Sequence, residues 1–304
     1  MERKIRQISI FRTNLAVADP DDTDINSEIL VSSVITDQDG NETERITYDI
    51  DGNPEERVLI SYKNGKPVEE ILEMGGEQAE RTTREFDSNG KLVKEFRHYL
   101  DGEPDQIAYE YDAEGHLVMR LLTDSDGEEG EKHLWIYDNK LLKREESTNE
   151  FGSLEFSKTY SYDENGTLDE VVELNLTGDE QTRLVTVFNE AGKVETDKRY
   201  DARGRLVARN IYTYDESGNN TSVEEETVSG KTLITLHYDD EGNNILQEEN
   251  GPDGSIGSRI QRTFSGQGQP QTTEVRMENT ARRMGQHYRL RYEYLYFGQE
   301  ASQQ

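Results

Sequence analysis

The sequence predicts an all-β protein, a long antiparallel meander of about twenty strands curled into a hairpin solenoid or a partly closed shell. Three observations predict this fold. A turn motif of an aromatic residue, Asp or Asn, two variable residues and Gly recurs along the chain, as in residues 111–115. Looser turns fall midway between its copies, and apolar residues alternate with polar residues between the turns. The aromatic residue of the motif falls at positions 62, 86, 111, 137, 162, 188, 214, 238 and 264, so one repeat of two strands spans about 25 residues.

The segments between turns are about eight residues long, which is the length of a strand. Leu290, Tyr292 and Tyr294 alternate with Arg289 and Arg291, as expected of a strand with two different faces. Gly provides the positive φ that these turns require, and Asp or Asn accepts hydrogen bonds from the backbone just ahead of it. Because strands twist, an open sheet of this size is expected to curl. A flat single-layer sheet is the alternative.

The position of the repeats divides the chain into three parts. Residues 1–34 are expected to form an N-terminal cap with an acidic loop at 19–24. Residues 35–280 form the array of β-hairpin repeats. Residues 281–304 form a C-terminal capping strand, expected at 287–297, and a tail, because the terminal units of a repeat array differ from the others.

The composition favours a basic partner. The formal net charge is -30, with 32% charged and 32% hydrophobic residues. Such a chain repels nucleic acid and anionic membranes and attracts basic proteins, although charge also keeps sheet edges from pairing between molecules. The chain has no Cys, and its first residues lack the apolar core of a signal peptide. We therefore expect a cytoplasmic protein, or an extracellular or cell-surface protein if a signal segment was removed.

No motif predicts catalysis, a cofactor or a metal site. The five His are not spaced as metal ligands. The sequence Asp-x-Asp-Gly occurs at 37–40, 49–52 and 124–127, as at the start of a calcium loop. The Glu that such a loop needs at its twelfth position is replaced by Tyr48, Ile60 and Trp135. These motifs are predicted to be hairpin turns, with weak calcium binding as the alternative.

The turn motif, together with a second aromatic residue two positions earlier, resembles the YD repeats of the Rhs and Tc-toxin family. The likeness is clearest at 109–112, 160–163 and 212–215 and covers residues 35–280. The resemblance implies a β-hairpin ribbon that spirals into a hollow shell, with structural rather than catalytic Tyr and Asp residues. The period here is longer than that of the family, and the Asp-Pro-x-Gly sequence at the end of its shell does not occur. Residues 62–67 and 88–92 also resemble the MORN-variant repeats of bacterial antitoxins.

We therefore expect a non-catalytic bacterial binding protein of the immunity or antitoxin type, whose acidic surface docks a basic toxin domain. The alternative is a secreted or surface-exposed structural repeat protein, a YD-repeat shell or spacer, that binds glycans or another chain. Trp135 is expected either to pack in the core or to anchor a partner. The candidate contacts with the partner are Asp124, Asp126, Glu128, Glu129, Glu131, Trp135, Glu224, Glu225 and Glu226.

Overall fold

The computed structural model describes residues 4–15, 27–100, 102–178, 181–279 and 284–299, and these contain strands and turns but no helix. These ranges therefore contain no helix that is long and apolar enough to cross a bilayer. The strands are β1 (Ile5–Asn14), β2 (Ile29–Thr36), β3 (Glu42–Tyr48), β4 (Pro54–Lys63), β5 (Lys66–Met74), β6 (Glu77–Phe86), β7 (Leu92–His98), β8 (Asp105–Tyr111), β9 (Leu117–Thr123), β10 (Glu129–Asp138), β11 (Leu141–Thr148), β12 (Leu154–Tyr162), β13 (Leu168–Asn175), β14 (Thr182–Phe188), β15 (Val194–Asp201), β16 (Leu206–Tyr214), β17 (Asn220–Thr227), β18 (Gly230–Tyr238), β19 (Asn244–Asn250), β20 (Ile256–Phe264), β21 (Pro270–Met277) and β22 (Gln286–Tyr296).

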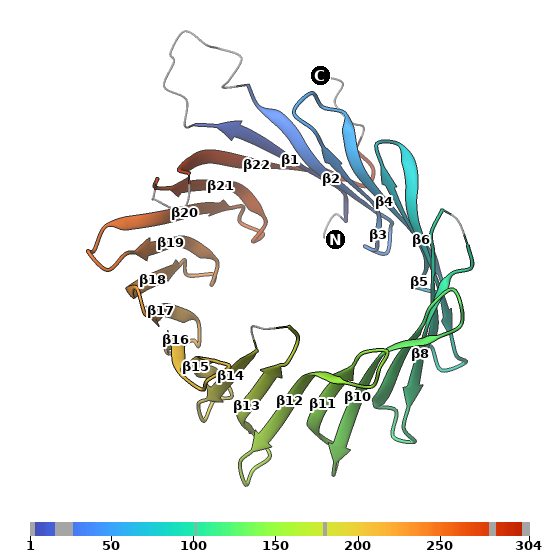
Figure 1. The fold of residues 1–304 in the computed structure, drawn as a ribbon. Coiled ribbons are helices and arrows are strands. Elements are labelled where there is room, and N and C mark those ends of the chain that lie inside the picture. Colours follow the sequence, from blue (N-terminus) through green and yellow to red (C-terminus); the bar gives the residue numbers. More distant parts are fainter. Residues whose placement is uncertain (1–3, 16–26, 101, 179–180, 280–283, 300–304) are drawn as a thin grey trace.

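Each strand pairs antiparallel with the strands before and after it, and β22 pairs antiparallel with β1, so the 22-stranded sheet closes into a barrel (Figure 1). The predicted all-β antiparallel meander is confirmed. The finer expectation of a solenoid or partly closed shell, and the flat-sheet alternative, are corrected by this closure. Strand twist curls the sheet, and pairing β1 with β22 removes the two edges that an open ribbon would expose.

Both ends of the chain belong to the wall of the barrel. The range 1–34, expected to form a cap, contributes β1 and most of β2, and the range 281–304 contributes β22. β1 lies between β22 and β2 in the sheet. The expected acidic loop at 19–24 lies outside the described residues.

The hairpin turns follow from the recurring motif. At residues 163–167, the amide of Asp163 donates to the carbonyl of Thr167 at 2.9 Å, and the amide of Gly166 donates back to the carbonyl of Asp163 at 3.1 Å. The Asp163 carboxylate accepts from the amides of Asn165 and Thr167, both at 2.8 Å. Gly166 has φ of +81°, which a residue with a Cβ rarely adopts. The motif therefore specifies a tight turn with a bulge.

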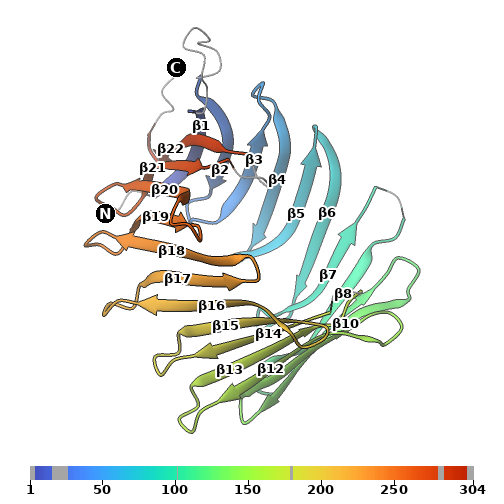
Figure 2. The same cartoon turned by 60° about the vertical axis from the view of Figure 1, so that its left-hand side comes forward.

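The meander places these turns at two ends of the barrel, seen from the side in Figure 2. Turns that follow even-numbered strands lie at one end, here called the first rim. Turns that follow odd-numbered strands lie at the other end, the second rim. The motif first noticed in the sequence forms the first rim, and the looser midway turns form the second.

Six tyrosine hydroxyls tie their strands to the preceding first-rim hairpin. The Tyr162 hydroxyl on β12 donates at 2.7 Å to the carbonyl of Leu142, which lies opposite Tyr137 where the β10–β11 ladder shifts register. A bulge of this kind disrupts the ladder locally, so the carbonyl gains a partner from the next repeat. The same bond, at 2.7 to 2.9 Å, joins Tyr62 to Glu42, Tyr111 to Leu92, Tyr214 to Val194, Tyr238 to Asn220 and Tyr294 to Pro270.

One face of the sheet is more buried than the other. Following the register from strand to strand, most of the buried side chains fall on the same face: Val58, Thr82, Glu95, Ile107, Ser147, Val171, Ser258, Thr273 and Val275. Side chains on the concave side of a closed sheet converge, so this face lines the lumen. Ile107, with no exposed surface, is its most buried member.

Ion pairs between strands cover both faces. On the outer face, Arg57 lies 2.7 Å from Glu44 and Arg81 lies 2.7 Å from Glu69. On the inner face, Arg84 bridges Glu70 at 3.0 Å and Glu95 at 3.1 Å. Exposed pairs such as Arg57 with Glu44 each contribute little to stability. In a pair as buried as Arg84 with Glu95, the loss of solvation offsets much of the attraction. The backbone ladder therefore supplies most of the order.

Replacing Tyr162 with Phe should destabilise the barrel by about 1 kcal/mol, because the Leu142 carbonyl loses a partner at a part-buried position. The measurement is the shift of the urea unfolding midpoint. Tyr200→Phe is the matched control, since the Tyr200 hydroxyl has no hydrogen-bond partner in the described ranges. Equal midpoints for the two variants would contradict the proposed role of the hydroxyl.

Stability should fall as the pH drops below about 3.8. The amide of Thr167 lowers the pKa of Asp163, and the Asn side chains four residues ahead lower the pKa of Asp37, Asp215 and Asp239, from an ordinary value of 3.8. A folded-state pKa below the unfolded value gives stability that is complete above 3.8 and lost as the pH falls through the folded-state pKa.

Melting temperatures between about pH 7 and pH 2 test this expectation. Changing Asp163, Asp215 and Asp239 together to Asn should leave the melting temperature at neutral pH unchanged. In acid, the melting temperature of this variant should fall less than that of the parent. Asn already makes the same turn at Asn189, whose side chain accepts from two amides at 3.0 Å. A melting temperature that rises steadily into acid would show that relief of charge repulsion dominates instead.

Candidate functional site

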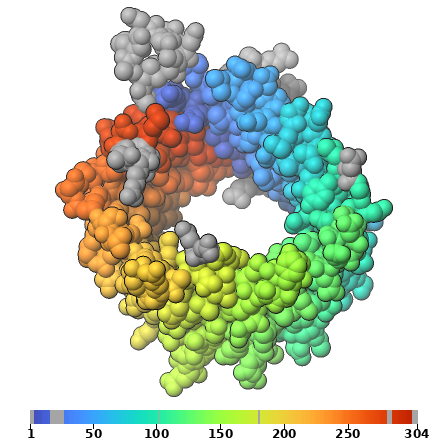
Figure 3. All heavy atoms as spheres, viewed as in Figure 1, coloured from blue at the N-terminus to red at the C-terminus, as the bar shows by residue number. Residues whose placement is uncertain are grey.

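The barrel is hollow along its axis (Figure 3). Twenty-two strands spaced about 4.8 Å apart give a circumference of about 105 Å and a backbone diameter of about 34 Å before strand tilt is added. Side chains on one face of a sheet extend about 5 Å, which leaves a lumen about 24 Å wide. An α-helix with its side chains is about 10–12 Å across, so the lumen is wide enough to admit a polypeptide segment.

An aromatic girdle surrounds the lumen near the first rim. Its rings are held by more than their hydroxyl bonds, because lysines lie over them: Lys91 over Tyr111 at 4.7 Å, and Lys143 over Tyr162 at 4.8 Å. Burial raises the pKa of Tyr111 and of Tyr162. These rings are packed against the wall, so they offer little free face for a ligand to stack on. The girdle comprises Tyr62, Phe86, Tyr111, Tyr137, Tyr162, Phe188, Tyr214, Tyr238, Phe264 and Tyr294.

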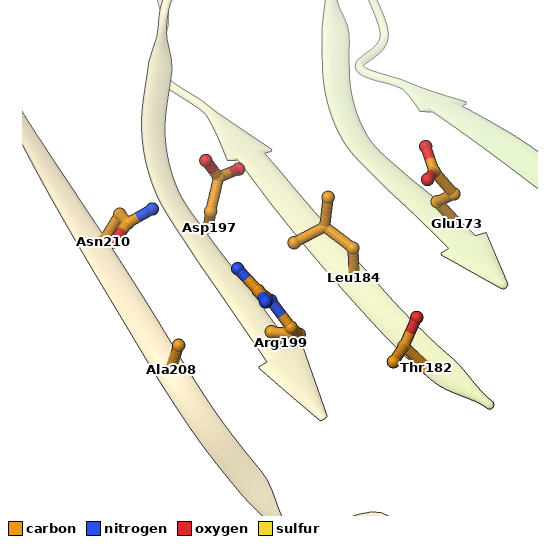
Figure 4. Close-up of a pocket in the computed structure, with 7 residues that line it drawn as sticks. All are labelled: Glu173, Thr182, Leu184, Asp197, Arg199, Ala208 and Asn210. Atoms are coloured by element: carbon orange, nitrogen blue, oxygen red, sulfur yellow. The ribbon is translucent and has the colours of Figure 1, made fainter. Parts of the chain in front are cut away.

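The inner wall of β13 to β16 carries a depression of about 360 Å³. Figure 4 shows its side chains on one side of four successive strands. β14 contributes an apolar side chain, Leu184, and β15 contributes Asp197 and Arg199. The full lining is Glu173, Thr182, Leu184, Asp197, Arg199, Ala208 and Asn210.

Two carboxylates of the depression are already engaged. Asp197 accepts from the Tyr212 hydroxyl at 2.7 Å and from the Thr186 hydroxyl at 2.7 Å. Burial, and then this bond to Asp197, raises the pKa of Tyr212 to about 12. Glu173 lies 3.1 Å from the ammonium of Lys158. The carboxylates are therefore fixed in place by the wall.

Two other polar groups of the depression have no partner among the described residues, and of these Arg199 is exposed. Arg199 forms no ion pair with any residue that the structure describes. The Oδ1 atom of Asn210 is buried without a hydrogen-bond partner in the same set of residues. A free guanidinium beside fixed carboxylates and an amide fits a small carboxylate or zwitterion. The lining includes no Ser–His or Cys–His pair for nucleophilic catalysis.

The first group of predicted contact residues lies at the second rim and on β10. Asp124, Asp126 and Glu128 belong to the turn between β9 and β10. The Asp124 carboxylate accepts from the amides of Asp126 and Glu128, each at 2.9 Å. Glu129 opens β10. Asp124 is thus part of the turn, whereas the side chains of Asp126 and Glu128 are exposed.

Glu131 and Trp135 lie on the inner face of β10. Glu131 is 3.5 Å from Arg120 and accepts from Ser147 at 3.2 Å. The ring of Trp135 stacks on His133 with 4.2 Å between centroids. The single tryptophan therefore packs within the wall and faces the lumen.

The second group lies on β17, on another side of the barrel (Figure 1). Glu224 and Glu226 share the outer face, where Lys231 pairs with both, at 2.8 Å from Glu224. Glu226 also pairs with Arg209. Glu225, between them in the chain, points to the inner face. The structure therefore does not bring the two predicted groups together, and it splits the second between two faces.

The Asp-x-Asp-Gly motifs form hairpin turns. The first Asp of each motif, Asp37, Asp49 or Asp124, accepts from the amides two and four residues ahead. In the ranges described, no three His, Cys, Asp or Glu side chains are grouped as ligands for a metal ion.

No family model and no curated protein matches this chain. A porin-like protein from Bacteroides uniformis ATCC 8492 is similar in structure over 96% of this chain and 98% of its own, at 8% identity and a TM-score of 0.33. A zinc-containing peptidase from Vibrio cholerae covers 72% of this chain and 83% of its own, at 11% identity and a TM-score of 0.14. Likenesses this weak bear on neither fold nor function.

The sequence does not predict the depression, although the resemblance to YD repeats implies a hollow interior. Arg199 and Asn210 belong to different strands, and only the pairing register places Asp197 opposite Asn210 and Arg199 opposite Ala208. Alternation along β15 and β16 predicts which of their residues share a face, but the register between the two strands cannot be obtained from local sequence.

The lumen should be open to solutes, and cysteine labelling tests this directly because the chain has no Cys of its own. Arg199→Cys should react with a small thiol reagent at a rate near that of a free thiol. Ile107→Cys, at a position with no exposed surface, should react at least about 100-fold more slowly. A slow reaction at position 199 would show that the lumen is blocked.

Proposed function

We propose that this chain is a non-catalytic binding protein that docks a basic protein partner, in the manner of a bacterial immunity protein or antitoxin. The observation that carries the proposal is where the charge lies. On both faces of the barrel, acidic and basic side chains alternate and pair across strands. The turns carry most of the surplus carboxylates.

The turn carboxylates fall into two kinds. Those that open the turns, such as Asp163, accept backbone amides and belong to the fold. Others, such as Asp51 and Asp126, form no ion pair within the described ranges and are exposed at the ends. A ring of unpaired negative charge raises the rate of encounter with a basic protein and repels nucleic acid.

The charged outer face supports the proposal that the barrel is surrounded by water and not by lipid. We propose a cytoplasmic location. Ion pairs such as Arg57 with Glu44 and Arg81 with Glu69 lie on the outer face, away from the ends of their strands. A charged side chain facing lipid at such a position costs about 2–4 kcal/mol. An extracellular or cell-surface location is the alternative that goes with the second candidate function.

That second candidate is a structural shell of the YD-repeat type, holding a glycan or another chain. The hollow lumen favours it (Figure 3). The packed state of the tyrosine rings at Tyr111 and Tyr162 favours a chain over a stacked sugar. Exchange protection on the inner wall when a partner binds would support the shell, whereas protection of the turns would support docking.

The proposal predicts an association rate that falls steeply with salt. A partner recovered from the native host by cross-linking should be basic. Its association rate with this chain, measured by stopped flow, should fall at least about tenfold between about 20 mM and 500 mM NaCl. An association rate that does not change with salt, or a partner without a basic surface, would remove the proposal.

A further inference from the structure

The exposed apolar side chains of this barrel gather at one end. Ile50, Leu100 and Phe151 are 80%, 78% and 82% exposed, and all three lie in turns of the second rim. Met74, at the end of β5, adds a fourth, 55% exposed. Ile50, Leu100 and Phe151 lie outside the strands, and Met74 is the last residue of its strand. Single exposed apolar residues are ordinary, but several on the turns of one rim are not.

The first rim is different. Its turns, such as residues 87–91, 163–167 and 239–243, are built from Asp, Asn, Ser, Thr, Glu, Lys and Gly. The apolar rings beneath them are covered by lysines. The barrel therefore has one polar end and one end with exposed apolar groups, although both ends use the same turn geometry.

The apolar side chains are interleaved with acids on one part of the second rim. From the β3–β4 turn to the β11–β12 turn, the turn residues include no Lys or Arg. Asp51, Glu77, Asp126 and Glu150 lie among the apolar groups, and none of their side chains forms an ion pair in the described part of the chain. We call this segment, from Ile50 to Phe151, the second-rim arc.

From these observations we infer that the second-rim arc is the docking surface for an amphipathic basic helix of the partner protein. The inference rests on the proposed function. It identifies the surface of the barrel that binds the partner and the element of the partner that binds there. Apolar groups of the helix would cover Ile50, Leu100 and Phe151, and lysines or arginines beside them would meet Asp51, Asp126 and Glu150.

The length and the negative charge of the second-rim arc favour a basic helix as the element that binds there. Neighbouring turns on one rim are two strands, about 9.6 Å, apart, so the arc from Ile50 to Phe151 is about 38 Å long when measured along the rim. Because the barrel is about 34 Å across, the two ends of the arc are about 31 Å apart in a straight line. A helix of about 20 residues spans about 30 Å. A second copy of the chain would bring like charges together on the same arc, and an anionic lipid surface would meet the same repulsion.

Two labelled peptides of about 20 residues test the inference against the full chain. One is an amphipathic helix of Leu and Lys, and the other has the same charge with Ser in place of Leu. The Leu–Lys peptide should bind at least about tenfold more tightly at low salt, as measured by fluorescence anisotropy. Changing Ile50, Leu100 and Phe151 together to Ser should remove that advantage and leave binding of the Ser–Lys peptide unchanged.

Ile136→Ser is the matched control, because Ile136 is 45% exposed near the first rim. This variant should bind both peptides as the parent does. If the triple variant keeps the advantage of the Leu–Lys peptide, or the control loses it equally, the arc is not the docking surface, while basic-partner docking stands. If neither peptide binds any form at low salt, the proposed function fails as well. A dimer in the ultracentrifuge that the triple variant disperses would assign the arc to a second copy and overturn the inference.

Discussion

The structure depends on the continuous ring of backbone hydrogen bonds that the pairing of β22 with β1 completes. Few side chains are fully buried, and only 32% of the residues are hydrophobic, so no large apolar core holds the strands together. Because the ring is closed, every strand has a partner on each side and no edge is left to pair with another molecule. The tyrosine bonds, such as that from Tyr162 to Leu142, strengthen this ring where bulges interrupt it.

Closure also decides where function can lie. In a single closed layer, both faces must satisfy their charges locally, and ion pairs such as Arg84 with Glu95 do so across adjacent strands. The lumen and the two ends are then the places where side chains are left to meet a ligand. Arg199 is unpaired within the described ranges of the inner wall, and Ile50 and Phe151 are exposed at one end.

Local structure was predictable to a large extent, and the arrangement of sites was not. The turn at residues 163–167 and the alternation around Tyr292 follow from residue type and spacing, and the structure confirms both. Glu224, Glu225 and Glu226 are all predicted to contact the partner, although consecutive strand residues point to opposite faces. The surroundings of Phe151 could not be predicted, because an apolar residue in a turn motif gives no sign of what lies next to it.

The sequence alone determined the repeat, the strand length and the turn chemistry, because each depends on contacts within about 25 residues. Only the tertiary structure decided that the ribbon closes, which face is concave and which apolar turns share an end. Those features depend on the accumulated twist and register of all the strands, and on the pairing of Ile5–Asn14 with residues nearly 300 positions away. A local sequence pattern cannot predict this accumulated twist and register.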